Sequence, residues 1–178
     1  MKYCASVITI CSLLTTSYTQ ADCNLTMSVE HFPPYSLAKG GEWSGLEIEL
    51  SQALFQEANC SVKYVTIPWK RSLYLLEHGS LDVLPSMSMT KKRQAFTHFI
   101  GPMRAENVSL VVSARDGTEL KKLDDIKRFE KRIGLGYAEY YGEAFTHKIE
   151  NDPSFAAKFE YTDFSTNNIK KLQRGRIS

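Results

Sequence analysis

The spacing of hydrophobic and polar positions changes between strand-like and helical several times in the first half of the chain. Residues 25–30 form a short strand candidate, which ends at His31-Phe-Pro-Pro34 because proline cannot continue a β-ladder. After a turn at 39–41, Ser44-Gly-Leu-Glu47 has the form of a capping box, with Ser44 as the expected N-cap. The helix that follows carries an apolar stripe at Leu46, Leu50, Ala53 and Leu54, and Asn59 can close it.

The same alternation of patterns continues through residue 100. Residues 61–67 are rich in Val, Tyr, Thr and Ile and predict a strand. Pro68 suits the start of a second helix, in which Trp69, Leu73 and Leu76 recur at helical spacing and which Gly79 ends. Residues 81–87 predict a buried strand and residues 91–100 a third helix. This β-α-β-α-β-α order predicts an α/β fold with a parallel sheet covered by helices.

The second half of the chain repeats the pattern less completely. Residues 107–115 alternate apolar and polar side chains, which predicts a strand with one half-exposed face. A charged stretch at 116–130 follows. Further elements are then expected: a strand at 132–137, a helix near 140–149, a strand at 158–163, a helix from 165 or 166 to 173, and the entry to another strand at 175–178. We therefore expect a first α/β lobe at 22–112 and a partial second α/β lobe at 113–178.

The segment 82–93 combines hydroxyl and basic side chains at the predicted ligand edge of the first sheet. Ligands of open parallel sheets bind beyond the carboxyl ends of the strands, and the loops 30–35, 67–69 and 85–90 meet that condition. Helix starts favour acidic residues, yet this one carries Lys91, Lys92 and Arg93. Two interpretations stay open here: an anion bound by hydroxyls, backbone N–H groups and Arg93, or a solvated basic helix start.

The first 21 residues have the pattern of a secretory signal peptide. Lys2 supplies a minimal positive region, residues 5–14 are apolar, and Thr19-Gln-Ala21 can serve as a cleavage site. The apolar run is shorter than the roughly 20 residues that span a membrane. We therefore predict export to the periplasm, with residues 1–21 removed.

Cysteine usage and charge narrow the class of protein further. An exported chain would keep Cys23 and Cys60, and a single pair in an oxidising compartment predicts a disulfide, with two unpaired buried thiols as the alternative. The chain has 22 Lys and Arg against 20 Asp and Glu, a near balance that gives no support for nucleic-acid binding. The four histidines show no metal-ligand spacing, so we predict neither a metal nor another cofactor.

Three motifs in order resemble the family 3 periplasmic solute-binding proteins, the polar amino-acid receptors of ABC importers. The motifs are Glu30-His-Phe-Pro-Pro-Tyr35, the run 41–50 that contains Trp-Ser-Gly-Leu-Glu, and the segment 82–93. The resemblance extends from about residue 25 to residue 177. It implies a periplasmic-binding-protein type 2 clamp, in which two α/β lobes close on a small ligand and present it to a membrane permease.

The resemblance also implies roles for individual residues. Ser86, Ser88 and Arg93 match positions that hold the α-carboxylate of the ligand, and an arginine fork suits a carboxylate geometrically. Phe32 and Trp69 match positions that wall the pocket, with core packing as the alternative. Glu30 matches an acidic position near the ligand amine, with a solvated strand end as the alternative.

The second lobe departs from the family pattern. Hydroxyl residues commonly follow the glycine that matches Gly136, whereas Tyr137, Ala138 and Glu139 stand there in this chain. The candidates for a ligand contact from this lobe are Glu139 or Tyr140. Family members also continue past residue 177 with a strand that bears an acidic residue and with a second hinge strand, so the chain resembles a C-terminally truncated member.

The expected function is that of an exported solute-binding protein without enzymatic activity. It would capture a small carboxylate-bearing ligand, an amino acid, for an ABC importer. One alternative is an exported enzyme of the cyclohexadienyl dehydratase type on the same fold, which would need a positioned acid such as Glu30 in its cleft. The other alternative is a non-functional truncated remnant.

Overall fold

The computed structural model describes residues 22–178, so the predicted signal peptide at 1–21 lies outside the described residues. In the first half the elements follow one another as β1 (Cys23–Ser28), β2 (Leu37–Lys39), β3 (Glu42–Ser44), α1 (Leu46–Glu57), β4 (Cys60–Val65), α2 (Trp69–Glu77) and α3 (Lys91–Gln94). The second half contains the 3-10 helix η1 (Leu123–Arg128), β5 (Ile133–Gly136), α4 (Glu143–Asn151), α5 (Pro153–Ala156), β6 (Phe159–Thr162) and α6 (Thr166–Gln173). The chain is thus a mixed α/β protein with parallel strand pairs in both halves.

The first sheet is built on β1, which lies between two parallel neighbours. It pairs with β4 along its whole length, and Met27 forms a single parallel bridge with Val83 on the other side. The predicted strand at 81–87 is therefore wrong as a regular element. One reason is that the Asp82 carboxylate accepts the Thr26 N–H at 2.7 Å, a donor that a third strand would otherwise use. Another is that Pro85 has no N–H to continue a ladder.

A disulfide joins the starts of β1 and β4. Cys23 and Cys60 are directly paired in the strand register, their Cα atoms are 4.5 Å apart, and they are separated by 37 residues in the sequence. The bridge therefore closes a loop that contains the β2–β3 hairpin and α1. The cysteine prediction is confirmed.

The predicted N-cap of α1 is wrong by one residue. Ser44 pairs with Leu37 in the β2–β3 hairpin, and Gly45 occupies the cap position with φ 109°. A Cβ atom at Gly45 would lie 2.6 Å from the Tyr35 carbonyl oxygen, so the close approach of two backbone segments also requires glycine there. Glu47 does not close a capping box with Ser44 but accepts a hydrogen bond from the Ser86 hydroxyl.

The apolar stripe on α1 faces outward. Leu46, Leu50 and Leu54 are 59%, 44% and 45% exposed. The opposite face of the helix is buried through Ile48, which packs with Met27 and Val29 of the first core. The stripe exists as predicted from its spacing, but it does not contribute to the core of the described chain.

Two further predicted elements are shortened or missing. The helix expected at 91–100 is the four-residue α3, and the strand expected at 107–115 is not formed. Its apolar side chains include Val108 and Val111, which are well exposed. Within residues 22–178 no neighbouring strand pairs with this segment, and a single strand without a partner cannot satisfy its backbone groups in a ladder.

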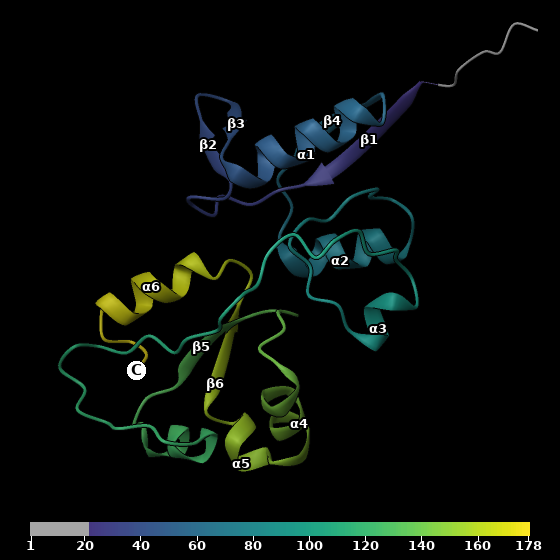
Figure 1. Ribbon diagram of the computed structural model, residues 1–178. Helices are drawn as coiled ribbons and strands as arrows, with labels where there is room; N and C mark the ends of the chain where they lie inside the picture. Colours follow the sequence, from purple (N-terminus) through teal and green to yellow (C-terminus); the bar gives the residue numbers. More distant parts are fainter. Residues whose placement is uncertain (1–21) are drawn as a thin grey trace, which may run out of the picture.

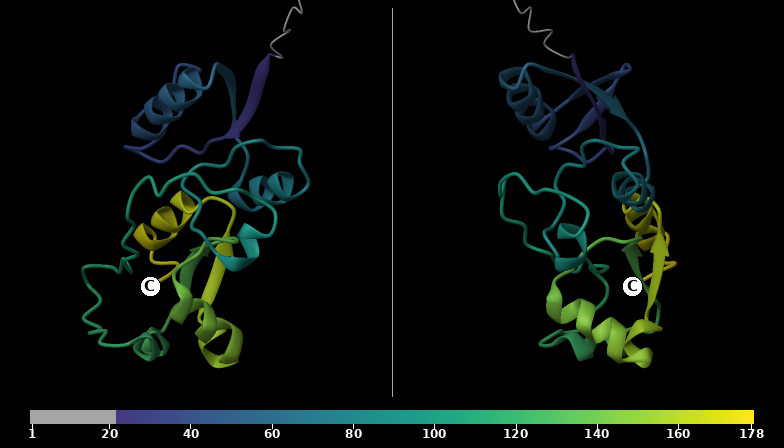
Figure 2. Two further views of the ribbon diagram at one scale, coloured as in Figure 1. Left: turned by 45° about the vertical axis from the view of Figure 1, so that its right-hand side comes forward. Right: turned by 90° about the vertical axis from the view of Figure 1, so that its right-hand side faces the viewer.

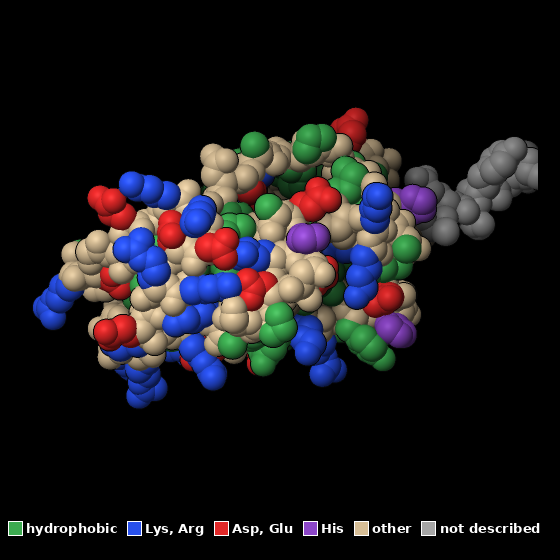
Figure 3. Space-filling model, turned by 90° about the horizontal axis from the view of Figure 1, so that it is seen from below, with side chains coloured by type: hydrophobic (Ala, Val, Ile, Leu, Met, Phe, Trp, Pro, Cys, Tyr) green, Lys and Arg blue, Asp and Glu red, His purple; other side chains and the backbone are tan. Residues whose placement is uncertain are grey.

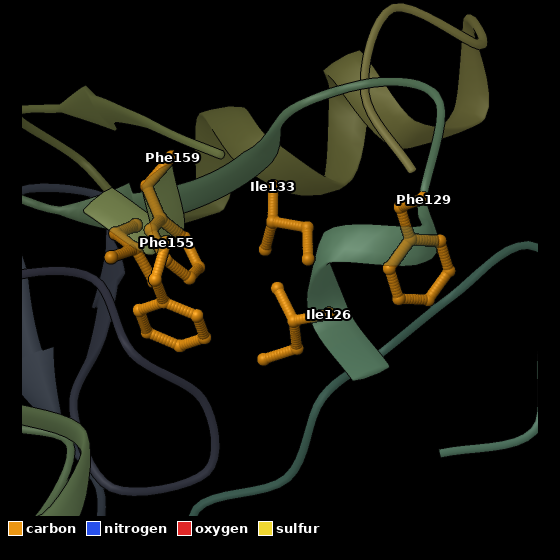
Figure 4. Packing of buried hydrophobic residues seen from close by; sticks show 6 residues of the cluster. Ile126, Phe129, Ile133, Phe155 and Phe159 are labelled. Carbon is orange, nitrogen blue, oxygen red and sulfur yellow. The ribbon is translucent and has the colours of Figure 1, made fainter. Parts of the chain in front are cut away.

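The second core follows the predicted pattern closely. β5 and β6 pair in parallel, with Ile133 opposite Phe159 and Gly136 opposite Thr162. Figure 4 shows the side chains that meet behind this pair, and the Phe155 and Phe159 rings pack edge to face with centroids 5.0 Å apart. The core is formed by Ile126, Phe129, Ile133, Leu135, Phe155 and Phe159. The strands at 132–137 and 158–163 and the helices at 140–149 and 165–173 are confirmed to within three residues at each end.

The end of the described chain lies beside β5 without forming a strand. Ile177 is buried, and the Ser178 N–H donates to the Arg132 carbonyl at 3.0 Å. The strand entry expected at 175–178 is thus limited to one backbone hydrogen bond.

The two cores lie at opposite ends of the molecule. In all three ribbon views, β1, β4 and α1 are at one end and α4 and α5 at the other, with α2 between them (Figures 1 and 2). Across residues 22–178, none of the helices is both long and apolar enough to span a membrane.

Candidate ligand-binding site

Arg93 is the central residue of the candidate site. It belongs to the single turn of α3, where the Thr90 hydroxyl caps the turn by accepting the Arg93 N–H at 3.2 Å. Only 8% of Arg93 is exposed. Its Nη1 donates to the Ser88 carbonyl at 2.9 Å, and its Nη2 donates to the Ala138 carbonyl at 2.9 Å. A cation from the first half is therefore held against a loop of the second half.

The charge of Arg93 has no carboxylate partner in the described chain. None of the salt bridges among residues 22–178 involves it, and its two acceptors are neutral carbonyl oxygens. Burial lowers the pKa of its guanidinium, although Tyr140 acts in the opposite direction. A buried cation of this kind is costly unless an anion is brought to it.

Trp69 lies beside Arg93 at the start of α2. Its ring centroid is 5.8 Å from the guanidinium carbon, and its Nε1 donates to the Ala138 carbonyl at 3.2 Å. The Ala138 carbonyl thus accepts hydrogen bonds from both residues. Ala138 has φ 59°, a left-handed conformation that is uncommon for alanine and that turns the chain directly after β5.

Glu30 is a half-buried carboxylate just beyond the end of β1. Its Oε1 is fully buried and has no hydrogen-bond partner among the described residues. Burial is the main cause that raises the pKa of Glu30; the Trp69 backbone N–H lowers it, and the charge of Glu139 raises it. Glu30 is therefore close to both Trp69 and the loop after β5.

Glu139 follows Ala138 and is held by its own lobe. The Tyr141 hydroxyl donates to Glu139 Oε2 at 2.6 Å and accepts the Gly136 N–H at 2.8 Å. Burial and the contact with Glu139 raise the pKa of the Tyr141 hydroxyl. The Glu139 carboxylate also covers Gly136, where a Cβ atom would collide with Oε1. The hydrogen bonds through Tyr141 thus hold Glu139 at the carboxyl end of β5.

The other predicted residues have different partners. The Ser86 hydroxyl donates to Glu47 and accepts from Arg104 Nη2 at 3.0 Å, so it is not directed at Arg93. Phe32 is 49% exposed and stacks on Tyr35 with ring centroids 5.7 Å apart. Ser88 contributes its backbone carbonyl to Arg93. The structure therefore brings together Arg93, Trp69, Ser88 and Glu30, and it gives Ser86 and Phe32 other contacts.

The basic start of α3 does not by itself make an anion site. α3 has only four residues, so its dipole is far smaller than that of a full helix. Lys91 and Lys92 are exposed on this turn, as the alternative of a solvated basic start requires. What supports an anion site is the burial of Arg93 without a counter-charge.

Sequence reasoning did not identify Ala138 as a partner of Arg93. Its contribution is a backbone carbonyl, which every residue possesses, so no residue type could have indicated it. Two open depressions of the described surface lie elsewhere, one lined by residues within 117–128 and one by residues within 143–152. The loop 137–140 instead covers Arg93. Within residues 22–178 no three His, Cys, Asp or Glu side chains gather as a metal site.

The sequence model of the bacterial extracellular solute-binding proteins, family 3, matches residues 25–175. The chain belongs to this family. Two relatives of the family 3 protein are a probable amino-acid-binding protein, YxeM, from Bacillus subtilis (strain 168) and a probable histidine-binding protein from Neisseria gonorrhoeae. The first is 20% identical over 81% of this chain and 53% of its own length, and the second 24% identical over 84% and 54%. The chain thus spans about half the length of these curated relatives.

Solved structures share the fold of this family 3 chain. An ancestral arginine-binding protein bound to arginine superposes with a TM-score of 0.73 at 22% identity, over 87% of this chain and 67% of that one. The arginine-bound form of a truncated ArgBP from T. maritima gives 0.72 at 19% identity, over 87% and 71%. An ancestral amino-acid-binding protein described as a precursor of cyclohexadienyl dehydratase gives 0.70 at 19% identity, over 87% and 68%. The predicted periplasmic-binding-protein type 2 fold is confirmed.

Proposed function

We propose that this chain binds a small amino acid at Arg93 and Glu30, between the half at 22–112 and the half at 113–178. The observation that supports the proposal is a pair of buried polar groups that lie in one region and lack binding partners. Arg93 is a buried cation without a carboxylate, and Glu30 Oε1 is a buried acceptor without a donor. An α-amino acid presents the opposite pair of charges, a carboxylate and an ammonium group.

The hydrogen bonds to Ala138 indicate where the ligand carboxylate would lie. Arg93 Nη2 and Trp69 Nε1 converge on one carbonyl oxygen. A carboxylate oxygen in that position would accept the same two hydrogen bonds and would add the missing negative charge, which makes them shorter and stronger. In this proposal the ligand replaces the Ala138 carbonyl, and the loop 137–140 closes over it.

Membership of a family of bacterial extracellular solute-binding proteins supports a receptor role. We propose that the chain acts in the periplasm, after removal of residues 1–21, and delivers its ligand to an ABC permease. The two relatives named for amino-acid and histidine binding support the ligand class. The chain would perform no chemistry on the ligand and would need no cofactor.

A panel of the common amino acids in a thermal-shift assay, followed by calorimetric titration, tests the proposal. At a ligand concentration about 100 times Kd, binding stabilises the folded chain by about 2.7 kcal/mol, which is a measurable rise in Tm. Arg93→Ala should weaken binding of every responding amino acid by at least about 30-fold, since it leaves a buried carboxylate unpaired. Lys92→Ala, in the same turn but exposed, is the matched control and should leave Kd unchanged.

Failure of the panel would contradict the proposal. If the folded wild-type chain shows no response to any amino acid, or if Arg93→Ala binds as well as wild type, the site is not where we place it. The first of these results would favour the non-functional remnant.

An enzyme of the cyclohexadienyl dehydratase type is the second hypothesis. The one feature that favours it is the raised pKa of Glu30, because an acid catalyst must hold a proton near neutral pH. Turnover of prephenate or arogenate by the wild-type chain, lost in Glu30→Gln, would establish the enzyme. Binding of amino acids without turnover would establish the receptor.

A further inference from the structure

We propose that the segment 107–113 is an interface between two copies of this chain, in which it pairs with itself as an antiparallel β-ladder. The inference goes beyond the proposed function and does not depend on the ligand site. The segment lies in the run for which the sequence predicts a strand and the structure forms none. Figure 1 shows it as an irregular trace between α3 and η1.

The backbone of this segment is available for pairing. Within residues 22–178, the backbone N–H and C=O groups of 105–112 form no hydrogen bond with the protein. Val108, Leu110 and Val111 are exposed, and the segment contains no proline, which would remove a donor. An unpaired strand of this composition is a template for a further strand, and the main-chain hydrogen bonds supply the affinity.

The pattern of apolar positions favours a second copy as the partner. In an extended conformation Val108, Leu110 and Val112 lie on one face of the segment. An antiparallel pair with a twofold axis at its centre sets each residue opposite one from the same face of the copy. Centred on Leu110, the pairing sets Leu110 opposite Leu110 and Val108 opposite Val112. The apolar side chains of both copies then form one continuous face, next to the second core that Val112 already contacts.

The charge of Glu106 selects the same register. A ladder centred one residue earlier would set the Glu106 carboxylate opposite Val112 of the copy, where it would lose water without gaining a partner. A ladder centred one residue later would bring it towards Asp116 of the copy, which is a like charge. Centred on Leu110, the ladder leaves Glu106 beside Ala114. Residues 107–114 carry no charge, so the ladder buries none.

The ends of the ladder carry complementary charges. Arg104 stands before the segment, where its Nη2 lies 2.6 Å from Glu106 Oε1. Asp116 stands after it, in the turn in which the Asp116 N–H donates to the Ser113 carbonyl at 2.9 Å. In the ladder centred on Leu110, the Arg104 end of each copy meets the Asp116 end of the other. The twofold axis repeats this attraction at both ends, as an interface between identical surfaces requires.

Disulfide cross-linking tests the interface and its register together. The full chain is used with Cys4 and Cys11 replaced by serine, so that Leu110→Cys adds the one free thiol beside the Cys23–Cys60 disulfide. Residues opposite each other in a ladder have Cα atoms about 4.5–5.5 Å apart, within the range that a disulfide spans. Leu110→Cys should therefore form a covalent dimer with twice the mass of the chain.

Val108→Cys is the matched control, because Val108 is exposed on the same face of the segment. The two copies of this residue would lie four positions apart along the ladder, about 13 Å, so Val108→Cys should cross-link at least about tenfold more slowly. Sedimentation velocity of wild type should show a concentration-dependent dimer. Leu110→Lys should raise the dissociation constant of that dimer at least about tenfold, because it sets two like charges opposite each other, and circular dichroism should show that the fold is retained.

Equal cross-linking rates for Leu110→Cys and Val108→Cys would indicate random collision and would overturn the inference. A wild-type chain that stays monomeric at every concentration would overturn it as well, and so would a Leu110→Lys variant that dimerises as well as wild type. Cross-linking in cells before lysis adds a further check. A product of any mass other than twice that of the chain would assign the segment to a different protein and would contradict pairing with a second copy.

Discussion

Glu30 is a carboxylate whose properties follow from its surroundings more than from its position in the sequence. Burial raises its pKa above the ordinary value of 4.5, and Glu139 adds to this effect. The unfolded chain therefore releases this proton near pH 4.5, while the folded chain holds it to a higher pH. Because the folded state binds more protons in that interval, Glu30 makes the free energy of unfolding fall as the pH rises above about 4.5.

Glu30→Gln should remove this dependence on pH. The variant should become more stable relative to wild type as the pH is raised from 4 to 7, as urea denaturation at each pH can measure. Asp152, whose pKa is lowered mainly by the hydrogen bond from Lys127, makes the free energy of unfolding rise with pH at lower pH. Because Asp152 is present in both proteins, its effect cancels in the difference between them. Glu42→Gln, at an exposed position of β3, is the control. A constant difference across this range would show that Glu30 is not desolvated.

At the scale of elements, α1 shows that helical spacing and burial are separate questions. The stripe of Leu46, Leu50 and Leu54 predicts a helix correctly, and the helix nevertheless buries Ile48 on its other face. Periodicity in the sequence reports the existence of an apolar face. It does not report whether the described chain contains the segment that would cover that face.

Replacing the three leucines together by glutamine should therefore change stability little and association more. Each exposed substitution should cost within about 0.5 kcal/mol, since glutamine and leucine have similar helix propensities. Size-exclusion chromatography at high concentration should show less self-association of the variant, because a contiguous apolar patch is removed. Ile48→Ala on the buried face is the contrasting variant and should cost about 2–5 kcal/mol. Global unfolding of the triple variant would contradict this assignment of faces.

The elements that the sequence predicted well are those with local signals. α2 follows Pro68 and closes at Gly79, which has φ 66°, and β5 and β6 are short apolar runs between turns. The three-residue strands β2 and β3 are too short to show a periodicity, and the error at Ser44 follows from missing them. The strand at 107–115 was not formed because alternation alone cannot provide a pairing partner.

In the candidate site, too, some residues are indicated by local motifs and others depend on contacts between distant segments. Arg93, Trp69 and Glu30 could be predicted from motifs, whereas the Ala138 carbonyl depends on how the loop after β5 meets the first half. Ser86 has contacts that its motif did not indicate, because its left-handed backbone, with φ 52°, turns its hydroxyl to Glu47 and Arg104. Such contacts join residues far apart in the chain and leave no local pattern.

At the scale of the whole molecule, the two halves have separate cores. Met27, Val29 and Ile48 form one, and Phe155 and Phe159 belong to the other. The disulfide closes a loop only within the first half. The face in Figure 3 shows acidic and basic side chains interspersed, so no large field of one sign acts on that face.

Separate cores predict that perturbations act on one half at a time. Replacing Cys23 and Cys60 by serine should lower the stability of the first half by about 4 kcal/mol through the loss of loop constraint. Phe155→Ala should lower that of the second half by about 3–5 kcal/mol. Hydrogen exchange should locate each loss in its own half, and calorimetry should show a broadened or divided transition. Equal effects of both variants on both halves would show a single cooperative unit.

The hydrogen bond from the Trp69 indole to the Ala138 carbonyl gives the molecule an optical reporter. The chain has two tryptophans, and the other, Trp43, packs against the first core. A Trp43→Phe background would therefore leave a single fluorophore at the point where the two halves meet. Its emission should shift when the indole exchanges the carbonyl for water or for a ligand oxygen. Opening and closing of the halves can thus be followed in real time by stopped-flow mixing, without an attached dye.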